Sequence, residues 1–323
     1  MKSGTTSARR RMLLSMVWLG MVVLEPVSFA GDALGAAEDW PRRFHNADHT
    51  VTELPAPPRR ILSTSVTVTG TLLAIDAPLV ASASAANGKF FAQWADVAEQ
   101  RSVENLWPAG GTDLEAVYAV APDLIVVSAT GADSAREHLA RLRAVAPTIV
   151  VDYGRQSWQG LANELAQAMG LEAQAAQRIA EFDRHVAQAR DRLALPEGQV
   201  NVISYNGPGT SNPIATRDGV HGQLLASLGF DVERPDPSWH STSDTASDFV
   251  WAQYEFLPQL KASTTFLLRA DDSRTAAMLN DPVLANLPSV RSRQVYALGL
   301  HAFRVDYYSA SELIDHIVRL FGR

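Results

Sequence analysis

The chain has 323 residues, of which 46% are hydrophobic and 20% are charged. These proportions are typical of a globular protein with one large or two ordinary domains, and they exclude a disordered or fibrous chain. The formal net charge of −7 argues against nucleic-acid binding, which depends on a basic surface. The chain contains no cysteine, so its own core rather than disulfides has to stabilise the fold.

Residues 1–37 show the order of parts that defines an export signal. Arg9–Arg11 precede the apolar run Met12–Leu24, and small residues follow at Ser28–Ala30 and at Gly35–Ala37. The apolar run is too short to span a bilayer comfortably, although a retained membrane anchor is the alternative. Since no cysteine is available for lipid attachment, we expect the chain in the periplasm after removal of this signal peptide. The adjacent arginines leave both the general and the twin-arginine export routes open.

Residues 38–154 alternate short β-rich runs with helical stretches. The β-rich runs, which often follow a proline, are Arg60–Val66, Pro78–Ser82, Pro122–Ser128 and Pro147–Asp152. The helical stretches between them are 68–73, 112–120 and 132–144. This alternation is typical of βαβ units, in which helices cover a parallel sheet. The pattern therefore predicts an N-terminal α/β lobe.

Residues 155–197 read as a helical connection. After a helix expected over Trp158–Met169 and a break at Gly170, apolar residues recur every three or four positions from Leu171 to Leu193. Pro196 follows this stripe and ends it. The spacing predicts one long helix that joins two lobes stiffly.

Residues 198–323 repeat the β and α alternation of the first half. The expected strands are Val200–Tyr205, Gly229–Glu233, Thr265–Leu268 and Gln294–Ala297. The expected helices are 219–228, 249–260, 275–280 and 309–321, and the polar stretch 207–219 is expected to be a loop. A second, C-terminal α/β lobe follows from this pattern.

The segment after the last expected strand carries the strongest functional signal. The strand ends at Gly299, a loop brings Phe303 and Arg304 together, and Ser309 is expected to open the final helix. Strand ends in α/β proteins are where ligands bind. A guanidinium beside aromatic rings suits an anionic aromatic ligand, because it bonds oxygen anions and stacks on π faces. The alternative is an arginine that merely covers a tyrosine in a structural turn.

Several segments resemble the periplasmic ferric enterobactin-binding proteins, which serve ABC importers of ferric catecholates. The resemblance runs over nearly all of the chain beyond residue 37, and its first and last segments match almost residue for residue. The matching segments are Trp40–Arg42, Arg60–Pro78, Ala121–Gly131, Asp133–Ser134, Gly229–Phe230 and Gln294–Ala310. The resemblance implies a class III periplasmic binding protein: two Rossmann-like α/β lobes joined by a long helix, with one ferric siderophore in the cleft. It also implies delivery to an inner-membrane ABC permease, a monomer, no enzymatic activity and no resident cofactor.

A ferric tris-catecholate is a bulky anion whose iron is already saturated by catechol oxygens. The protein then needs no metal ligands of its own, but positive charge and aromatic surface at the cleft. The candidate ligand-binding residues are Lys89, Trp107, Phe303, Arg304, Arg217 and Tyr308. The resemblance suggests a basic residue at Lys89 and an aromatic contact at Trp107. Arg217 could equally be a solvated loop arginine, and we expect either Tyr307 or Tyr308 near the cleft and the other in the core.

Two acidic residues occupy equivalent places in the two halves. Glu115 lies at the head of the helix before Pro122, and Glu255 lies in the helix expected before Thr265. In the family that the chain resembles, such glutamates face outward and dock onto arginines of the permease. The alternative for each is an ordinary surface acid. The short 87–91 loop and the lack of an aromatic in 212–215 leave open which catecholate is bound.

Other function classes find less support in the residues. A haem, cobalamin or hydroxamate binder is the nearest alternative, and haem would use Tyr308, His240 or His301 as an axial ligand. A free-metal site is not indicated, because no His/Asp/Glu set has convincing ligand spacing. A periplasmic hydrolase is the distant alternative, but the chain has no Gly-x-Ser-x-Gly elbow and no cysteine, so no catalytic residue is predicted.

Overall fold

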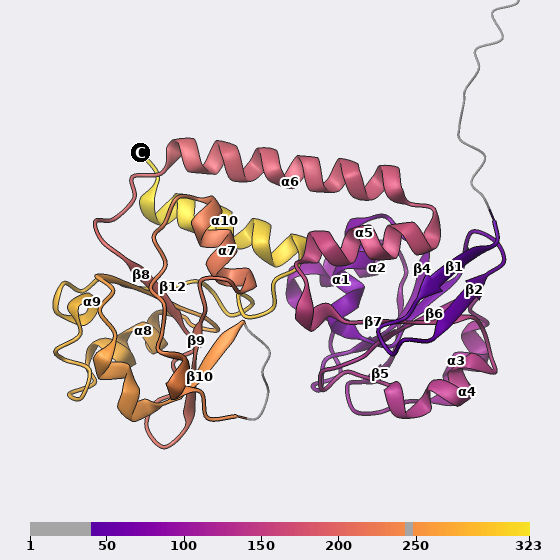
Figure 1. Cartoon of the computed structure of the whole chain (residues 1–323), viewed down its shortest axis with the longest axis horizontal. Coiled ribbons are helices and arrows are strands. Elements are labelled where there is room, and N and C mark those ends of the chain that lie inside the picture. The colour runs from indigo at the N-terminus through magenta and orange to yellow at the C-terminus, as the bar shows by residue number, and fades with distance from the viewer. Residues whose placement is uncertain (1–39, 243–247) are drawn as a thin grey trace, which may run out of the picture. The chain divides into compact units, whose positions relative to one another are not determined.

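The computed structural model describes residues 40–242 and 248–323 (Figure 1). The predicted signal peptide lies outside these residues. No helix within the two described ranges is long and apolar enough to cross a membrane. The domain boundaries at 38–154, 155–197 and 198–323 remain predictions.

The first lobe is built on a parallel five-stranded sheet with strand order β5-β4-β3-β6-β7. Its strands are β3 (Ile61–Ser63), β4 (Leu79–Ser84), β5 (Glu104–Pro108), β6 (Leu124–Ser128) and β7 (Thr148–Val151). The helices between them are α1 (Val66–Ala74), α2 (Ala92–Gln100), α3 (Leu114–Val120) and α4 (Leu139–Arg143). An antiparallel pair, β1 (Arg42–His45) and β2 (Val51–Leu54), precedes the sheet. The expected βαβ lobe is therefore confirmed.

The second lobe has a mixed sheet with strand order β10-β9-β8-β11-β12. Its strands are β8 (Val200–Ile203), β9 (Ser211–Ala215), β10 (Phe249–Gln253), β11 (Thr264–Leu267) and β12 (Val295–Ala297). Strands β8, β11 and β12 are parallel, whereas β9 runs antiparallel to both of its neighbours. The α-helices of this lobe are α7 (Val220–Ser227), α8 (Asp272–Leu279), α9 (Pro288–Arg291) and α10 (Tyr307–Phe321).

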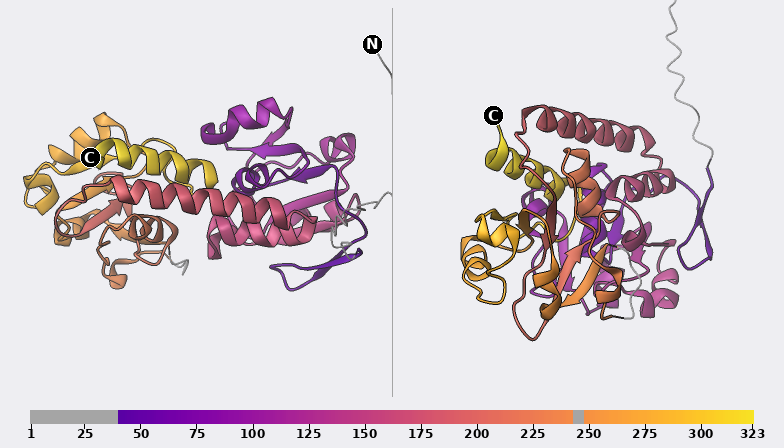
Figure 2. Two further views of the ribbon diagram at one scale, coloured as in Figure 1. Left: turned by 90° about the horizontal axis from the view of Figure 1, so that it is seen from above. Right: turned by 60° about the vertical axis from the view of Figure 1, so that its left-hand side comes forward.

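Helices α5 (Trp158–Met169) and α6 (Glu172–Arg192) connect the two sheets. Gly170 separates them with a left-handed backbone (φ 74°), which glycine adopts without strain. Figures 1 and 2 show α6 alongside α10, the last helix of the chain. The buried face of α6 carries Ala175, Phe182 and Ala189, spaced seven residues apart, as a long amphipathic helix requires. The predicted connecting helix is confirmed.

Three predicted elements of the second half are wrong. The helix expected over 249–260 is strand β10 followed by the 3-10 helix η4 (Tyr254–Gln259), and Pro258 lies inside that helix. The loop expected over 207–219 contains strand β9. The strand expected over 229–233 is reduced to a single bridge between Val200 and Val232.

The last helix also starts earlier than predicted. Asp306, not Ser309, caps α10: its carboxylate accepts from the Ser309 backbone N–H at 2.9 Å, and the Ser309 hydroxyl accepts from the Asp306 N–H at 3.0 Å. This reciprocal capping box satisfies two backbone donors. The second oxygen of Asp306 accepts from the Gln93 side chain at 3.2 Å, and it approaches Gly70 so closely that a Cβ there would lie 2.7 Å from it. Asp306 thus joins the start of α10 to helices α1 and α2 of the first lobe.

Candidate ligand-binding cleft

A pocket of about 310 Å³ lies between the two lobes, where the carboxyl ends of both sheets contribute loops. The first lobe supplies residues after β3, β6 and β7, among them Thr67, Gly131 and Tyr153. The second lobe supplies the start of α7, strand β10 and the loop that carries Phe303 and Arg304. This is the position at which open α/β sheets bind ligands.

Phe303 and Arg304 both line this pocket, as the sequence predicted. The Phe303 ring stacks on Phe249 of β10, with centroids 5.2 Å apart and planes 8° from parallel. The guanidinium carbon of Arg304 lies 5.7 Å from the Phe303 ring and 5.8 Å from the ring of Tyr153, which belongs to the first lobe. Arg304 therefore stands between aromatic surfaces of both lobes.

Arg269 is a second cation beside the cleft that sequence reasoning missed. Its guanidinium lies 4.0 Å from the Phe303 ring centroid, and it donates to the Ser204 hydroxyl at 3.3 Å. Burial lowers the pKa of Arg269, and the charge of Arg304 lowers it further. Within the described ranges no carboxylate forms an ion pair with Arg269 or Arg304. The signal that could have found Arg269 is its place two residues after the carboxyl end of β11. The structure adds that its backbone is left-handed (φ 49°), which is uncommon outside glycine.

The first-lobe wall of the cleft is organised around Asp133. Its carboxylate accepts from the Ser65 hydroxyl at 2.6 Å, from the Thr67 backbone N–H at 3.0 Å and from the Tyr153 hydroxyl at 3.1 Å. Burial, with a smaller contribution from Asp133, raises the pKa of Tyr153 to about 12, so the phenol is neutral at ordinary pH. The negative charge of Asp133 is held at the N-terminus of α1, where the helix dipole stabilises it. The wall thus presents a neutral ring to the cleft.

The other predicted ligand contacts lie outside this pocket. Lys89 is exposed in the turn after β4, where Ala85 N–H donates to the Lys89 carbonyl. Trp107 was predicted to contact ligand, but it lies in β5 with 5% of its surface exposed and packs in the first-lobe core, so that prediction is wrong. Lys89 stays on the same sheet edge as the cleft because it follows the carboxyl end of β4.

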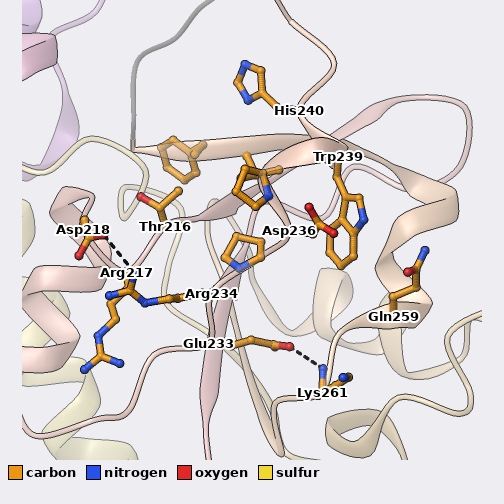
Figure 3. Close-up of a pocket in the computed structure, with 14 residues that line it drawn as sticks. Thr216, Arg217, Asp218, Glu233, Arg234, Asp236, Trp239, His240, Gln259 and Lys261 are labelled. Carbon is orange, nitrogen blue, oxygen red and sulfur yellow. Dashed lines mark hydrogen bonds and ion pairs between the residues drawn. The ribbon is translucent and has the colours of Figure 1, made fainter.

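Arg217 belongs to a second pocket, of about 930 Å³, on the second lobe (Figure 3). Arg217 pairs with Asp231 at 3.2 Å, which supports the alternative of a loop arginine that already has a partner. Figure 3 shows Trp239 and Gln259 on one side of this pocket and Arg234 with Asp218 on the other. The two basic residues drawn on that side are both paired with acids, so they offer no free cation to an anionic ligand.

Tyr308 faces helices rather than the cleft. Its ring meets Tyr307 edge-on at 5.2 Å, and burial raises its pKa to about 12, with Arg101 and Arg178 acting in the opposite direction. Tyr307 packs on Trp158 and Phe182 in the core. The expectation that one of the two tyrosines lies near the cleft is therefore wrong, and the tyrosine that lines the cleft is Tyr153 of the first lobe.

Glu115 and Glu255 are both exposed and occupy corresponding positions. Glu115 lies in the first turn of α3 after β5, and Glu255 lies in the first turn of η4 after β10. Strands β5 and β10 are each an outer edge of their sheet. The described ranges contain no cluster of three or more His, Asp or Glu side chains that could hold a metal ion.

Two α/β lobes joined by a long helix, with a cleft between the carboxyl ends of their sheets, define the class III periplasmic binding proteins. The periplasmic binding protein family matches residues 61–301, and the chain belongs to that family. It is 38% identical, over 96% of its own length and 100% of the relative, to the ferric enterobactin-binding periplasmic protein FepB of Escherichia coli O6:H1. The resemblance inferred from the sequence segments is thereby confirmed.

Solved structures agree on the fold. The crystal structure of holo-ViuP shares 52% sequence identity with this chain and superposes with a TM-score of 0.85, over 88% of this chain and 96% of ViuP. Staphylococcus aureus SirA in complex with staphyloferrin B gives a TM-score of 0.67 at 19% identity, over 86% of this chain and 97% of SirA. The latter likeness shows the fold alone.

Proposed function

We propose that the protein binds a ferric catecholate siderophore of the enterobactin type in its interlobe cleft. The observation that carries this proposal is the pair Arg269 and Arg304, which lie against the Phe303 ring and form no ion pair with a carboxylate in the described ranges. Two guanidiniums beside stacked aromatic rings suit a ligand that is both strongly anionic and aromatic. The 38% identity to FepB, which is named for ferric enterobactin, supports the same ligand class.

The alternatives have weaker support. A relative named as an iron(3+)-hydroxamate-binding protein, FhuD of Bacillus subtilis, is 32% identical over only 32% of this chain. For haem, the predicted axial ligand Tyr308 packs among helices, and His240 lines the second pocket rather than the cleft. His221, which does line the cleft, is bonded to a backbone carbonyl. His301 lines a separate pocket beside α10, so none of the three predicted axial haem ligands lines the cleft.

The second part of the proposal is delivery. We infer that an exported monomer, freed of residues 1–37, carries its ligand to an inner-membrane ABC permease in the periplasm. Glu115 and Glu255 would dock the two lobes, since each is exposed at the first turn after an outer-edge strand. The transported iron complex is cargo, and no catalytic residue or resident cofactor is proposed.

Quenching of intrinsic tryptophan fluorescence tests the ligand class. Trp158 and Trp251 line the cleft, so a coloured iron complex bound there should quench them. We expect saturable quenching by ferric enterobactin and by ferric complexes of linear or monomeric catecholates, with little by ferrichrome or haem. Equal or stronger binding of ferrichrome, or no catecholate binding by a folded protein, would overturn the proposal.

A further inference from the structure

His221 is a buried histidine at the back of the cleft, in the first turn of α7, with 2% of its surface exposed. Its Nε2 lies 2.8 Å from the carbonyl oxygen of Ala302, the residue just before Phe303 and Arg304. A carbonyl can only accept, so Nε2 carries the proton and donates it. In the neutral ring Nδ1 is then an acceptor, and it is buried without a hydrogen-bond partner in the described structure.

We propose that His221 is the positioning residue for Phe303 and Arg304, and so determines how the cleft presents its cation and its aromatic surface to a ligand. This inference rests on the proposed function of the cleft. His221 itself need not touch the ligand. It acts through the loop of residues 299–305, whose backbone it holds at Ala302.

Two contacts connect His221 to this loop. The first is the hydrogen bond to Ala302. The second runs through Phe249, whose ring lies 5.3 Å from the imidazole and stacks on Phe303. Arg269 lies against the same Phe303 ring at 4.0 Å. The side chains therefore pack in a continuous series from His221 through Phe249 and Phe303 to Arg269. A displaced histidine would shift the surface that meets the ligand.

Few other groups hold the loop. In the described chain two side chains hydrogen-bond the backbone of residues 300–305: His221 at the Ala302 carbonyl and Ser309 at the Arg304 carbonyl. Ser309 fixes the end at the α10 capping box, whereas His221 fixes the middle. Removing the His221 bond leaves the stretch between Gly299 and Arg304 without a side-chain tether.

The support for His221 is rigid. A Cβ on Gly222 would lie 2.2 Å from the Thr216 carbonyl oxygen, which shows how closely the first turn of α7 is pressed onto the end of β9. Asp248 accepts from the Val220 backbone N–H at 3.3 Å, and its own carbonyl accepts from Thr216 at 2.9 Å. His221 therefore projects from the tightly packed start of α7 toward a loop that has few contacts of its own to hold it.

The unpartnered Nδ1 supports a positioning role. A buried polar atom without a partner costs free energy, and a leucine of similar volume would avoid that cost. Burial also lowers the pKa of His221 to about 4, and the charge of Arg304 acts in the same direction, so the ring is neutral at ordinary pH. The polar interaction that the His221 side chain makes is thus the hydrogen bond that it donates to the Ala302 carbonyl.

Two amide substitutions at His221 separate the effect of the hydrogen bond to Ala302 from the effect of side-chain volume. In His221→Gln the side-chain nitrogen extends about as far as Nε2 and can donate to Ala302, whereas in His221→Asn it is too short. We expect ferric enterobactin affinity within about threefold of the parent for Gln, and about tenfold weaker for Asn, the size of one lost hydrogen bond. In an Arg304→Ala background the Gln and Asn variants should differ much less, because the group being positioned is gone.

Hydrogen exchange without ligand keeps the test independent of the ligand class. His221→Asn should accelerate exchange in peptides covering residues 299–306 and leave the two sheets protected, and His221→Gln should not. Local loosening supports the positioning role even if ferric enterobactin fails to bind the parent protein. Equal affinities and equal exchange for the two amides, or loosening spread over both sheets, would overturn it and leave His221 as an ordinary core residue.

Discussion

At the scale of single residues, the main feature of the cleft is a pair of arginine side chains that lie against the same phenylalanine ring. Arg269 and Arg304 both lie against Phe303, and the pKa of Arg269 is lowered by its burial and by the charge of Arg304. Their mutual repulsion is a cost in the empty protein that a bound anion would remove. An anionic ligand should therefore gain from both arginines at once.

Replacement of either arginine should weaken binding strongly. We expect Arg269→Ala and Arg304→Ala each to cost ~1.5–3 kcal/mol of ferric enterobactin binding free energy, the range for a hydrogen bond to a charged group. Lys89→Ala should cost less, since a flexible exposed ammonium is easily replaced by water. Fluorescence titration measures these losses, with exposed Arg141→Ala as the control. Full affinity in Arg269→Ala would remove that residue from the site.

The neutral state of His221 has a consequence for stability in acid. Its pKa is about 4 in the folded protein against an ordinary 6.5, so between these values the unfolded chain binds a proton that the folded chain does not. Stability is then lost as pH falls from about 6.5 to about 4, by roughly 3 kcal/mol in all. His221→Gln should lack this contribution. Urea midpoints at pH 7.5 and 4.5 check it: an equal acid loss in both proteins would contradict the assignment.

Residue roles were only partly predictable from sequence. Phe303 and Arg304 were found because a cation and an aromatic ring follow a recognisable strand end. Arg269 escaped because its left-handed conformation and its contact with Phe303 depend on packing between β11 and the final loop. Trp107 was misplaced because an aromatic near a strand end can face either the core or the cleft, and strand register decides which.

At the scale of elements, the parallel strands other than β5 were predicted, whereas β5, β9 and β10 were not. Pro213 lies inside β9, an interior strand that β10 and β8 flank, where a proline is unusual and argues against a strand. Residues 249–260 have apolar side chains at both helical and strand spacings. Residues 249–253 form a strand because all five pair with β9, and no local signal in the sequence indicates that pairing.

The contact between α1 and the start of α10 leaves little room for a side chain at Gly70. A Cβ on Gly70 would lie 2.7 Å from the Asp306 carboxylate and 3.0 Å from Trp94, both of them buried. We expect Gly70→Ala to destabilise the fold by ~1–3 kcal/mol, because overpacking outweighs the better helix propensity of alanine.

The matched control is Gly160→Ala in α5. There the closest atom to the new Cβ would be the oxygen at the end of the Gln156 side chain, at 3.0 Å, and the next two atoms, at 3.4 and 3.7 Å, lie at ordinary contact distance. Chemical denaturation should show Gly160→Ala at least as stable as the parent, with a gain of up to ~1 kcal/mol from helix propensity. If both alanine variants behaved alike, the close approach of Asp306 to Gly70 would have no energetic weight.

At the scale of the whole molecule, the two lobes present matching acidic positions. If Glu115 and Glu255 dock the lobes onto a permease, reversing both to arginine should leave siderophore affinity unchanged while abolishing uptake, because like charges would face each other across the interface. Siderophore-dependent growth of a strain without its own binding protein measures this.

The control for the docking experiment is a second double variant that changes the net charge by the same amount at positions away from the proposed docking sites. Glu53 and Glu197 are exposed and lie away from the two outer-edge strands, so Glu53→Arg with Glu197→Arg should support normal growth. Equal growth of both double variants, at equal periplasmic levels, would show that Glu115 and Glu255 are ordinary surface acids.

The position of α10 affects the order in which the protein can be assembled. Helix α10 spans Tyr307–Phe321, yet it packs on α1 and α2 of the first lobe, and Tyr307 joins Trp158 and Phe182 in their aromatic cluster. A chain made from its N-terminus therefore completes its first-made lobe only after its final helix has been synthesised. Until α10 is made, the first lobe lacks the contacts that this helix forms with α1 and α2.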